Sequence, residues 1–300
     1  MKTTATVPAW RADLALAVIA LIWGTTFVVV KNALAGASTM LFLTLRFTVA
    51  TAALAVLYRG RLSTAGTGGR AAVRGGALAG VFLIASYFFQ TQGLRYTTPS
   101  KSAFITGMSV VLVPLLGALV YRILPGLSEI LGVLVAAAGM GLLTVRWDNL
   151  RIEFGDALTL ACAAGFAVHI LVVGHFTSRG GFELLSLTQI ATAAALGWAS
   201  FWWMETPQLI WSAGLAGALL VTGLLATALA FTAMAWAQQH TTPTHTALIF
   251  SLEPVFAWLT SWLVAGETLS PAATLGAVLI LAGILLVELK PWQRRVPCAL

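Results

Sequence analysis

The sequence of 300 residues is too apolar for a soluble protein, because 59% of its residues are hydrophobic and only 9% are charged. Soluble globular domains carry about 25% charged residues. The net charge of +7 does not indicate a nucleic-acid partner, since the basic residues stand in short connections between apolar segments and not on one soluble face. These numbers exclude a soluble globular domain and predict a multi-pass protein of the lipid bilayer.

Apolar segments of about 20 residues, the length that crosses a ~30 Å hydrocarbon layer as a helix, recur along the whole chain. The first, at 14–30, is too long for a signal-peptide core and lacks a small-residue cleavage site, so we expect a retained span. The connections are too short to hold a soluble domain. The expected fold class is an all-α membrane protein with ten transmembrane helices, at about 12–33, 39–58, 75–95, 100–121, 127–145, 155–176, 183–203, 211–236, 243–265 and 271–289.

Most Lys and Arg residues of the connections fall on one side of these ten spans, the side that also holds both termini. Cytoplasmic loops retain such an excess of basic residues. We therefore predict a protein of the cell inner (plasma) membrane with both termini in the cytoplasm.

An internal repeat divides the chain into two halves. The stretch 90–107 returns in altered form at 234–251, and its Thr-Thr-Pro corner at 97–99 falls on 241–243 without a gap. We expect a first five-helix repeat over 1–150 and a second over 151–300. Because five spans are an odd number, the two halves enter the membrane from opposite sides. Inverted repeats of this kind are typical of secondary transporters.

Several short motifs occur in the same order in this repeat. They are W-G-T-T-F at 23–27, T-T-P-x-x-x-A in both halves, L-E-P-V-F at 252–256, G-E-T-L-S at 266–270 and G-A-V-L-I-L-A-G at 276–283. With these motifs the chain resembles the EamA-domain transporters of the drug/metabolite transporter superfamily, and within it the YddG-type exporters of aromatic amino acids and related metabolites. The resemblance implies a central cavity surrounded by the third, fourth, eighth and ninth helices, with the first and sixth at its sides. It also implies export.

The candidate substrate-binding residues are aromatic and polar side chains that the repeat puts in equivalent places. Residues three apart share one face of a helix, as do 87 and 90 in the third span and 231 and 234 in the eighth. Rings with a few hydrogen-bonding groups suit a flat, amphipathic metabolite. The alternative is that the aromatics only pack or form interfacial belts, and that Gln90 and Thr106 only join helices. The predicted set is Trp23, Thr26, Tyr87, Gln90, Phe166, His169, Phe231 and Met234.

Glu253 is a carboxyl group in the middle of the ninth span. A charge there costs about 2.5–3.5 kcal/mol on insertion scales unless it is neutral, paired or hydrated, so such residues often relay protons. Its place before Pro254 also fits a local structural role, because proline loosens the helix. The first half has Ser109 at this position, so the acid is not duplicated. Protons are thus a candidate coupling ion.

Lys101 and His245 stand at equivalent places after the two Thr-Thr-Pro corners, which makes them candidates for coupling or gating. Snorkelling of the side chain to the interface explains Lys101, and also Arg46 in the second span. Binding of a substrate carboxylate is the alternative for both.

Glycines and prolines predict contacts and bends. Gly132 with Gly139, and Gly276 with Gly283, lie seven apart on one face of the fifth and tenth spans, which favours close helix contact within the protein or between two copies. Prolines at 114 and 254 are expected to bend helices.

No catalytic site is visible: the four histidines are not spaced as metal ligands, and neither a nucleophile-elbow motif nor a phosphate-binding glycine loop is present. The two cysteines give no disulfide or metal pattern. We therefore predict a transporter and not an enzyme, without cofactor or metal, that exports aromatic amino acids or similar small organic metabolites. An uptake or exchange carrier for a nucleotide-sugar or purine-like solute, an intramembrane enzyme and a structural protein remain the alternatives.

Overall fold

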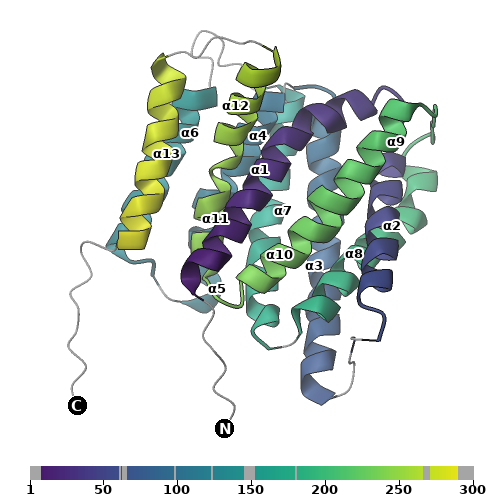
Figure 1. Ribbon diagram of the computed structural model, residues 1–300, viewed down its shortest axis with the longest axis horizontal. Helices are drawn as coiled ribbons and strands as arrows, with labels where there is room; N and C mark the ends of the chain where they lie inside the picture. Colours follow the sequence, from purple (N-terminus) through teal and green to yellow (C-terminus); the bar gives the residue numbers. More distant parts are fainter. Residues whose placement is uncertain are drawn as a thin grey trace.

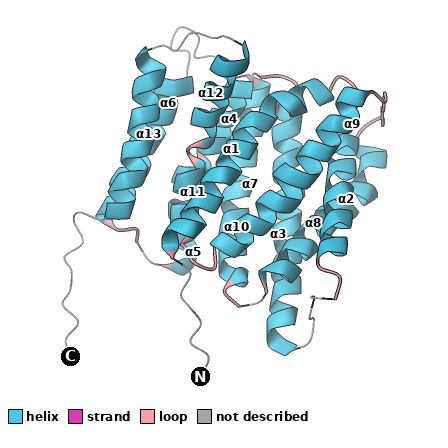
Figure 2. Cartoon of the chain, in the orientation of Figure 1, coloured by secondary structure: helices cyan, strands magenta, loops and turns pink. Residues whose placement is uncertain are grey.

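The computed structural model describes residues 8–60, 62, 66–97, 99–122, 124–144, 153–179, 181–265 and 271–289. Motif residues 98 and 266–270 lie outside this range. The described chain is helical, with one isolated β-bridge between Ala37 and Leu209 and no strands, which confirms the predicted all-helical class (Figures 1 and 2). Its helices are α1 (Ala9–Ala33), α2 (Thr39–Leu57), α3 (Gly66–Gly93), α4 (Pro99–Gly107), α5 (Ser109–Tyr121), α6 (Leu127–Thr144), α7 (Phe154–Thr177), α8 (Phe182–Met204), α9 (Ala213–Leu220), the π-helix η1 (Val221–Leu229), α10 (Ala230–Ala237), α11 (Pro243–Phe250), α12 (Glu253–Ala265) and α13 (Pro271–Leu289).

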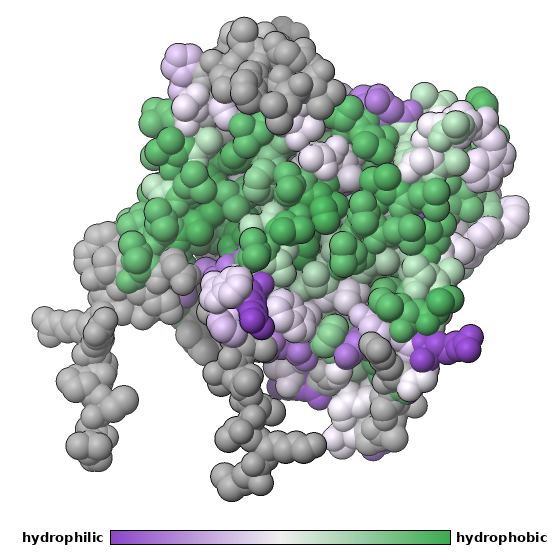
Figure 3. Space-filling view, in the orientation of Figure 1, coloured by the Kyte–Doolittle hydropathy of each residue, from purple (hydrophilic) through white to green (hydrophobic). Residues whose placement is uncertain are grey.

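The surface has the character of a membrane protein. Seven helical stretches of the described chain are long and apolar enough to cross a bilayer, and α6 and α13 contain shorter apolar stretches. An apolar band crosses the visible face between more polar edges (Figure 3). Exposed tryptophans lie toward the two ends of the helices, Trp10 at the start of α1 and Trp203 at the end of α8. Tryptophan is enriched at membrane interfaces. The apolar band and the positions of the exposed tryptophans therefore both indicate a protein that spans a bilayer.

Two of the helical rods are broken at equivalent places. The rod of α4 and α5 is interrupted at Met108, and that of α11 and α12 at Ser251 and Leu252. The second break precedes Pro254, which has no amide hydrogen and whose ring clashes with a carbonyl one turn back. In Figure 1 α4 lies above α5, whereas α11 lies below α12, so the two broken rods run in opposite directions.

The rod of α9, η1 and α10 contains two turns of π-helix. Within η1 the hydroxyl of Thr227 donates to the carbonyl of Thr222, five residues earlier, at 2.7 Å. A π-helix is wider than an α-helix and is frequent at functional sites. It brings the Ala226 carbonyl and the Thr227 hydroxyl against α2.

α6 and α13 pack side by side along their glycines. A Cβ atom on Gly139 would lie 2.6 Å from the carbonyl oxygen of Gly276, and one on Gly132 would lie 2.7 Å from that of Gly283. Any side chain at these positions would collide with backbone. The predicted close contact is therefore present, and it joins the first half of the chain to the second.

The other contacts between the two halves also occur in matching pairs. α3 packs against α7 and α8, and η1 packs against α1 and α2. In the same way α7 packs against α4 and α5, whereas α1 packs against α11 and α12. Helix α1 thus lies beside the broken rod of the second half, and helix α7 lies beside that of the first half. The centre of the molecule lies between these two groups of helices.

Candidate functional site

A cavity lies at this centre and is lined from both halves of the chain. Its open volume, traced by the centre of a water-sized sphere, is about 50 Å³. A water molecule needs about 10–15 Å³ on this scale, so the conformation described here has room for a few waters. All eight residues predicted from the repeat line the cavity, together with Glu253 and further residues: Trp23, Thr26, Phe27, Val30, Arg46, Tyr87, Gln90, Leu94, Thr106, Gly107, Ser109, Phe166, His169, Ile170, Phe231, Met234, Phe250 and Glu253.

Aromatic rings form a continuous cluster around the cavity. The ring centroid of Trp23 lies 4.9 Å from that of Phe250 and 5.3 Å from that of Phe231. Tyr87 lies 5.2 Å from Phe166 and 6.0 Å from Phe231, edge to face in both pairs. Such arrangements stabilise ring pairs beyond the burial of their area. The cluster joins α1, α3, α7, α10 and α11 and offers ring surface to a flat solute.

Arg46 on α2 is a cation inside this cavity, with only 2% of its surface exposed. Its Nε donates to the hydroxyl of Thr227 at 2.7 Å, and its Nη2 donates to the hydroxyl of Tyr87 at 3.0 Å and to the carbonyl of Ala226 at 3.3 Å. The guanidinium carbon lies 4.2 Å from the centroid of the Tyr87 ring. The interpretation of Arg46 as a snorkelling residue is therefore wrong, because its side chain is held within the bundle by α3 and η1.

The indole of Trp23 is tied to the same part of η1. Its Nε1 donates to the carbonyl of Ala226 at 2.9 Å, so that one carbonyl receives both Trp23 and Arg46. Thr26, one turn further along α1, donates its hydroxyl to the carbonyl of Trp23 at 2.9 Å. The π-helix thus fixes one aromatic and one charged side chain of the cavity wall.

Three polar residues of the lining make hydrogen bonds near it. Gln90 donates through Nε2 to the hydroxyl of Thr106 at 3.1 Å, which is the helix-to-helix bond considered above, although both residues also line the cavity. On the opposite side Nε2 of His169 lies 2.9 Å from Oε1 of Gln189. Gln189 occupies the place in the second repeat that Arg46 occupies in the first.

Glu253 is the first residue of α12 and is 7% exposed. It lines the cavity and makes no hydrogen bond or ion pair with the described residues. The free amides at a helix N-terminus favour a carboxylate. Gly24 of the W-G-T-T-F motif lets α1 approach this turn, since a Cβ atom there would lie 2.6 Å from the carbonyl oxygen of Glu253.

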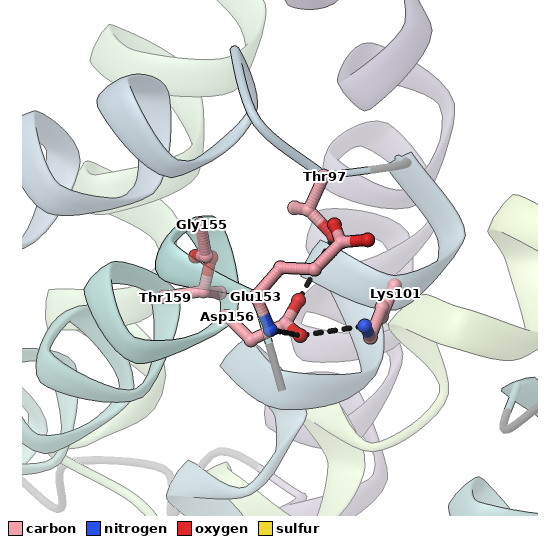
Figure 4. A network of polar contacts seen from close by, with 6 residues as sticks. All are labelled: Thr97, Lys101, Glu153, Gly155, Asp156 and Thr159. Carbon is pink, nitrogen blue, oxygen red and sulfur yellow. Dashed lines mark hydrogen bonds and ion pairs between the residues drawn. The ribbon is translucent and has the colours of Figure 1, made fainter. Parts of the chain in front are cut away.

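Lys101 and His245 do not line the cavity but bind carboxylates at the starts of α4 and α11. Nζ of Lys101 lies 2.5 Å from Asp156, which also accepts a hydrogen bond from the Thr97 hydroxyl at 3.0 Å (Figure 4). Nε2 of His245 lies 3.0 Å from Asp13. Asp13 and Asp156 align in the sequence repeat, and α4 and α11 begin at opposite ends of the molecule (Figure 1).

The two halves match one family of proteins. The model of the EamA-like transporter family fits the chain twice, over residues 10–145 and 153–289. The chain belongs to the EamA-like transporter family. An uncharacterized transporter from Archaeoglobus fulgidus is 35% identical over 279 residues, which cover 93% of this chain and 86% of that protein. A solved crystal structure superposes with a TM-score of 0.76 at 18% identity, covering 93% of this chain and 97% of the other, which shows a shared fold.

Membership in the EamA-like family confirms the predicted transporter class, and a transporter is not an enzyme. The bilayer and a small-molecule substrate are its partners. The polar and aromatic cavity between the halves is the candidate site for that substrate. Repeat-equivalent spacing predicted eight of its lining residues, whereas for Arg46 the sequence left snorkelling and binding of a substrate carboxylate open, because a lone cation in a span carries no periodic signal.

Proposed function

We propose that this EamA-like protein is a secondary transporter that exports small organic metabolites, with aromatic amino acids or similar amphipathic solutes as the leading class. Its mechanism is alternating access, in which two inverted halves expose a central site to each side of the membrane in turn. The observation that carries the proposal is the central cavity, where a cluster of five aromatic rings lies beside a few polar groups.

The proposed layout is ten transmembrane helices from two inverted five-helix repeats, 1–150 and 151–300. The two matches to the family model, the opposite directions of the broken rods and the paired packing of the helices support it. The excess of basic residues on the side of the termini supports an inner-membrane protein with both ends in the cytoplasm.

Substrate binding at the cavity assigns a role to the eight lining residues predicted from the repeat. The rings supply contact area, and Gln90, Thr26 and His169 supply hydrogen bonds that orient the solute. Because the described cavity has room for only a few waters, a solute enters by separating the helices at one end.

The two corner contacts are the proposed gates. The Lys101–Asp156 contact closes one end of the molecule and the Asp13–His245 contact closes the other. Breaking one while the other holds would open the cavity to a single side. Glu253, a cavity-facing acid without an ion-pair partner among the described residues, is the proposed site of proton coupling.

Counterflow in proteoliposomes tests the transport proposal. Vesicles loaded with unlabelled phenylalanine, tyrosine or tryptophan are expected to accelerate uptake of the labelled amino acid, and a proton gradient is expected to change the rate. Phe231→Leu should slow this uptake, because it removes a cavity ring, while the exposed Phe154→Leu should not.

Other outcomes separate the alternatives. Acceleration by purines or nucleotide sugars alone would overturn the aromatic class and favour an exchange carrier. No accelerated uptake of any solute would overturn transport of these classes by this cavity.

A further inference from the structure

Arg46 has hydrogen-bonding capacity that the protein does not use. A guanidinium group carries five N–H donors, one on Nε and two on each Nη. The hydroxyl of Thr227, the hydroxyl of Tyr87 and the carbonyl of Ala226 take the donors of Nε and Nη2. Within the described part of the chain Nη1 donates to no residue, and Arg46 makes no further hydrogen bond or ion pair besides these bonds and its ring contacts. Two donors of a fixed cation in the cavity wall therefore remain available.

The charge of Arg46 is also not paired with a carboxylate of the described residues. Arg46 forms no ion pair with the described residues, and Glu253 shares the cavity without binding it. A buried charge without a partner is costly, and a lone arginine at membrane depth would lower that cost by reaching the interface. Here the hydrogen bonds from α3 and η1 hold the guanidinium inward instead. The protein thus maintains a cation at the place where a solute would lie.

We infer that Arg46 binds a carboxylate of the transported solute, so that the substrate class is an organic acid with an apolar or aromatic body. This inference rests on the proposed transport through the cavity. The planar guanidinium matches a carboxylate better than an ammonium group does. The hydroxyl of Tyr87 accepts from Arg46 and keeps its own proton, so it supplies a further donor beside the same cation.

The surrounding rings define where the rest of the solute lies. Tyr87 contacts both Phe166 and Phe231, so the carboxylate site borders directly on the aromatic cluster. The equivalent position of the other half offers no cation, because Gln189 is there and is bonded to His169. A carboxylate therefore has one binding position in the cavity, on the side of the first repeat.

A matched pair of solutes tests the role of Arg46. 3-Phenylpropionate and 3-phenylpropionamide have the same ring and chain and differ in the carboxylate. Wild-type protein in nanodiscs is expected to bind the acid about 10-fold more tightly than the amide, as a hydrogen-bonded charge provides. In Arg46→Gln this ratio should fall to about 1, and Arg46→Lys should retain part of it. Arg59→Gln, at an exposed arginine beyond α2, is the control and should leave the ratio unchanged.

Each outcome decides the inference. Equal binding of acid and amide by the wild type, binding of neither, or an unchanged ratio in Arg46→Gln would overturn it, and the first two need no variant. Flux of phenylalanine measured in parallel tests the proposed function separately. If the protein transports phenylalanine but binds acid and amide equally, the inference about Arg46 is wrong and the proposed function stands. If it binds the acid more tightly but does not transport phenylalanine, the aromatic amino-acid proposal is wrong and Arg46 remains the carboxylate site.

Discussion

In the first half of the chain α2 brings Arg46 into the cavity, whereas at the same place in the second half α8 has Gln189, which does not line the cavity and is bonded to His169. The acid is distributed in the opposite way, with Glu253 at the start of α12 and Ser109 at the start of α5. The repeat thus supplies similar helices on both sides, while the charges are unequal. The cavity is therefore not symmetric, because its arginine comes from the first half and its acid from the second.

The corners between helices differ in a similar way. Asp156 meets a lysine at one end of the molecule, and Asp13 meets a histidine at the other. A lysine pairs with a carboxylate as a cation, whereas a histidine forms an ion pair only when its imidazole is protonated. Equivalent positions therefore carry a permanent ion pair on one side and a proton-dependent one on the other. Variants at these positions test which features the two halves of the chain share and in which they differ.

The largest effect is expected where the halves are most alike, at the glycines of α6 and α13. Gly139→Leu would drive a side chain into the backbone of Gly276, and overpacking with a backbone collision should cost about 3 kcal/mol of folding free energy. Gly141→Leu is the matched control, because a Cβ atom there meets nothing within 4 Å. Thermal unfolding in detergent measures both, and equal stability of the two variants would contradict the close contact.

Glu253→Gln removes the acid that the first half lacks. We expect counterflow of the solute to persist within about twofold, because the amide keeps the size of the side chain, and we expect the response to a proton gradient to disappear. Proteoliposome flux with and without the gradient measures this, with Glu183→Gln on α8 as the control. A variant that still responds to the gradient as the wild type does would exclude Glu253 as the coupling site.

Much of the architecture follows from local sequence. Pro99 and Pro243 begin α4 and α11 because proline is suited to the first turn of a helix. The pairs 87 with 90 and 231 with 234 face one cavity because residues three apart share a helix face. The sequence repeat then predicts which helix faces contact one another, since equivalent helices of the two halves pack in equivalent ways.

Other parts of the site depend on packing that no local pattern encodes. Arg46 in a span can point to lipid interface or to protein, and the choice is made by the rotation of α2 against η1 and α3. The π-helix at η1 shifts the hydrogen-bond register without a characteristic residue, and it alone presents the Ala226 carbonyl to Arg46 and Trp23. The contact of Asp13 with His245 joins residues far apart in the sequence and becomes visible only once α1 lies beside α11.

Trp23→Phe makes the first half more like the second, which has Phe166 at this place. The variant keeps ring area but loses the bond from the indole to the Ala226 carbonyl, so the folding free energy should fall by about 1 kcal/mol. Thermal unfolding measures the loss. Trp203→Phe is the control, since that exposed indole donates only within its own helix, to Ala199. If Trp203→Phe lowered the folding free energy more than Trp23→Phe does, the hydrogen bond of the Trp23 indole would contribute little to stability.

The smallest effect is expected from exchanging the corner residues. His245→Lys gives both ends a permanent ion pair, and Lys101→His gives both a proton-dependent contact. Partly exposed ion pairs contribute about 0.2–1 kcal/mol, so each exchange should change the ratio of the two access states, and with it the flux, by about fivefold at most.

The two exchanges should change the pH dependence of the flux in opposite directions. In His245→Lys, flux should decrease because the Asp13 end opens less often, and the fraction of the flux that varies with pH should shrink because the contact no longer needs a protonated imidazole. In Lys101→His, that fraction should grow, since a contact that held at every pH now weakens as the imidazole loses its proton. Flux through oriented proteoliposomes at matched internal and external pH, without a gradient, measures both variants, and Glu253→Gln in the background keeps the cavity acid from adding its own response. If the two exchanges moved the pH dependence in the same direction, the corner contacts would not act as opposed gates.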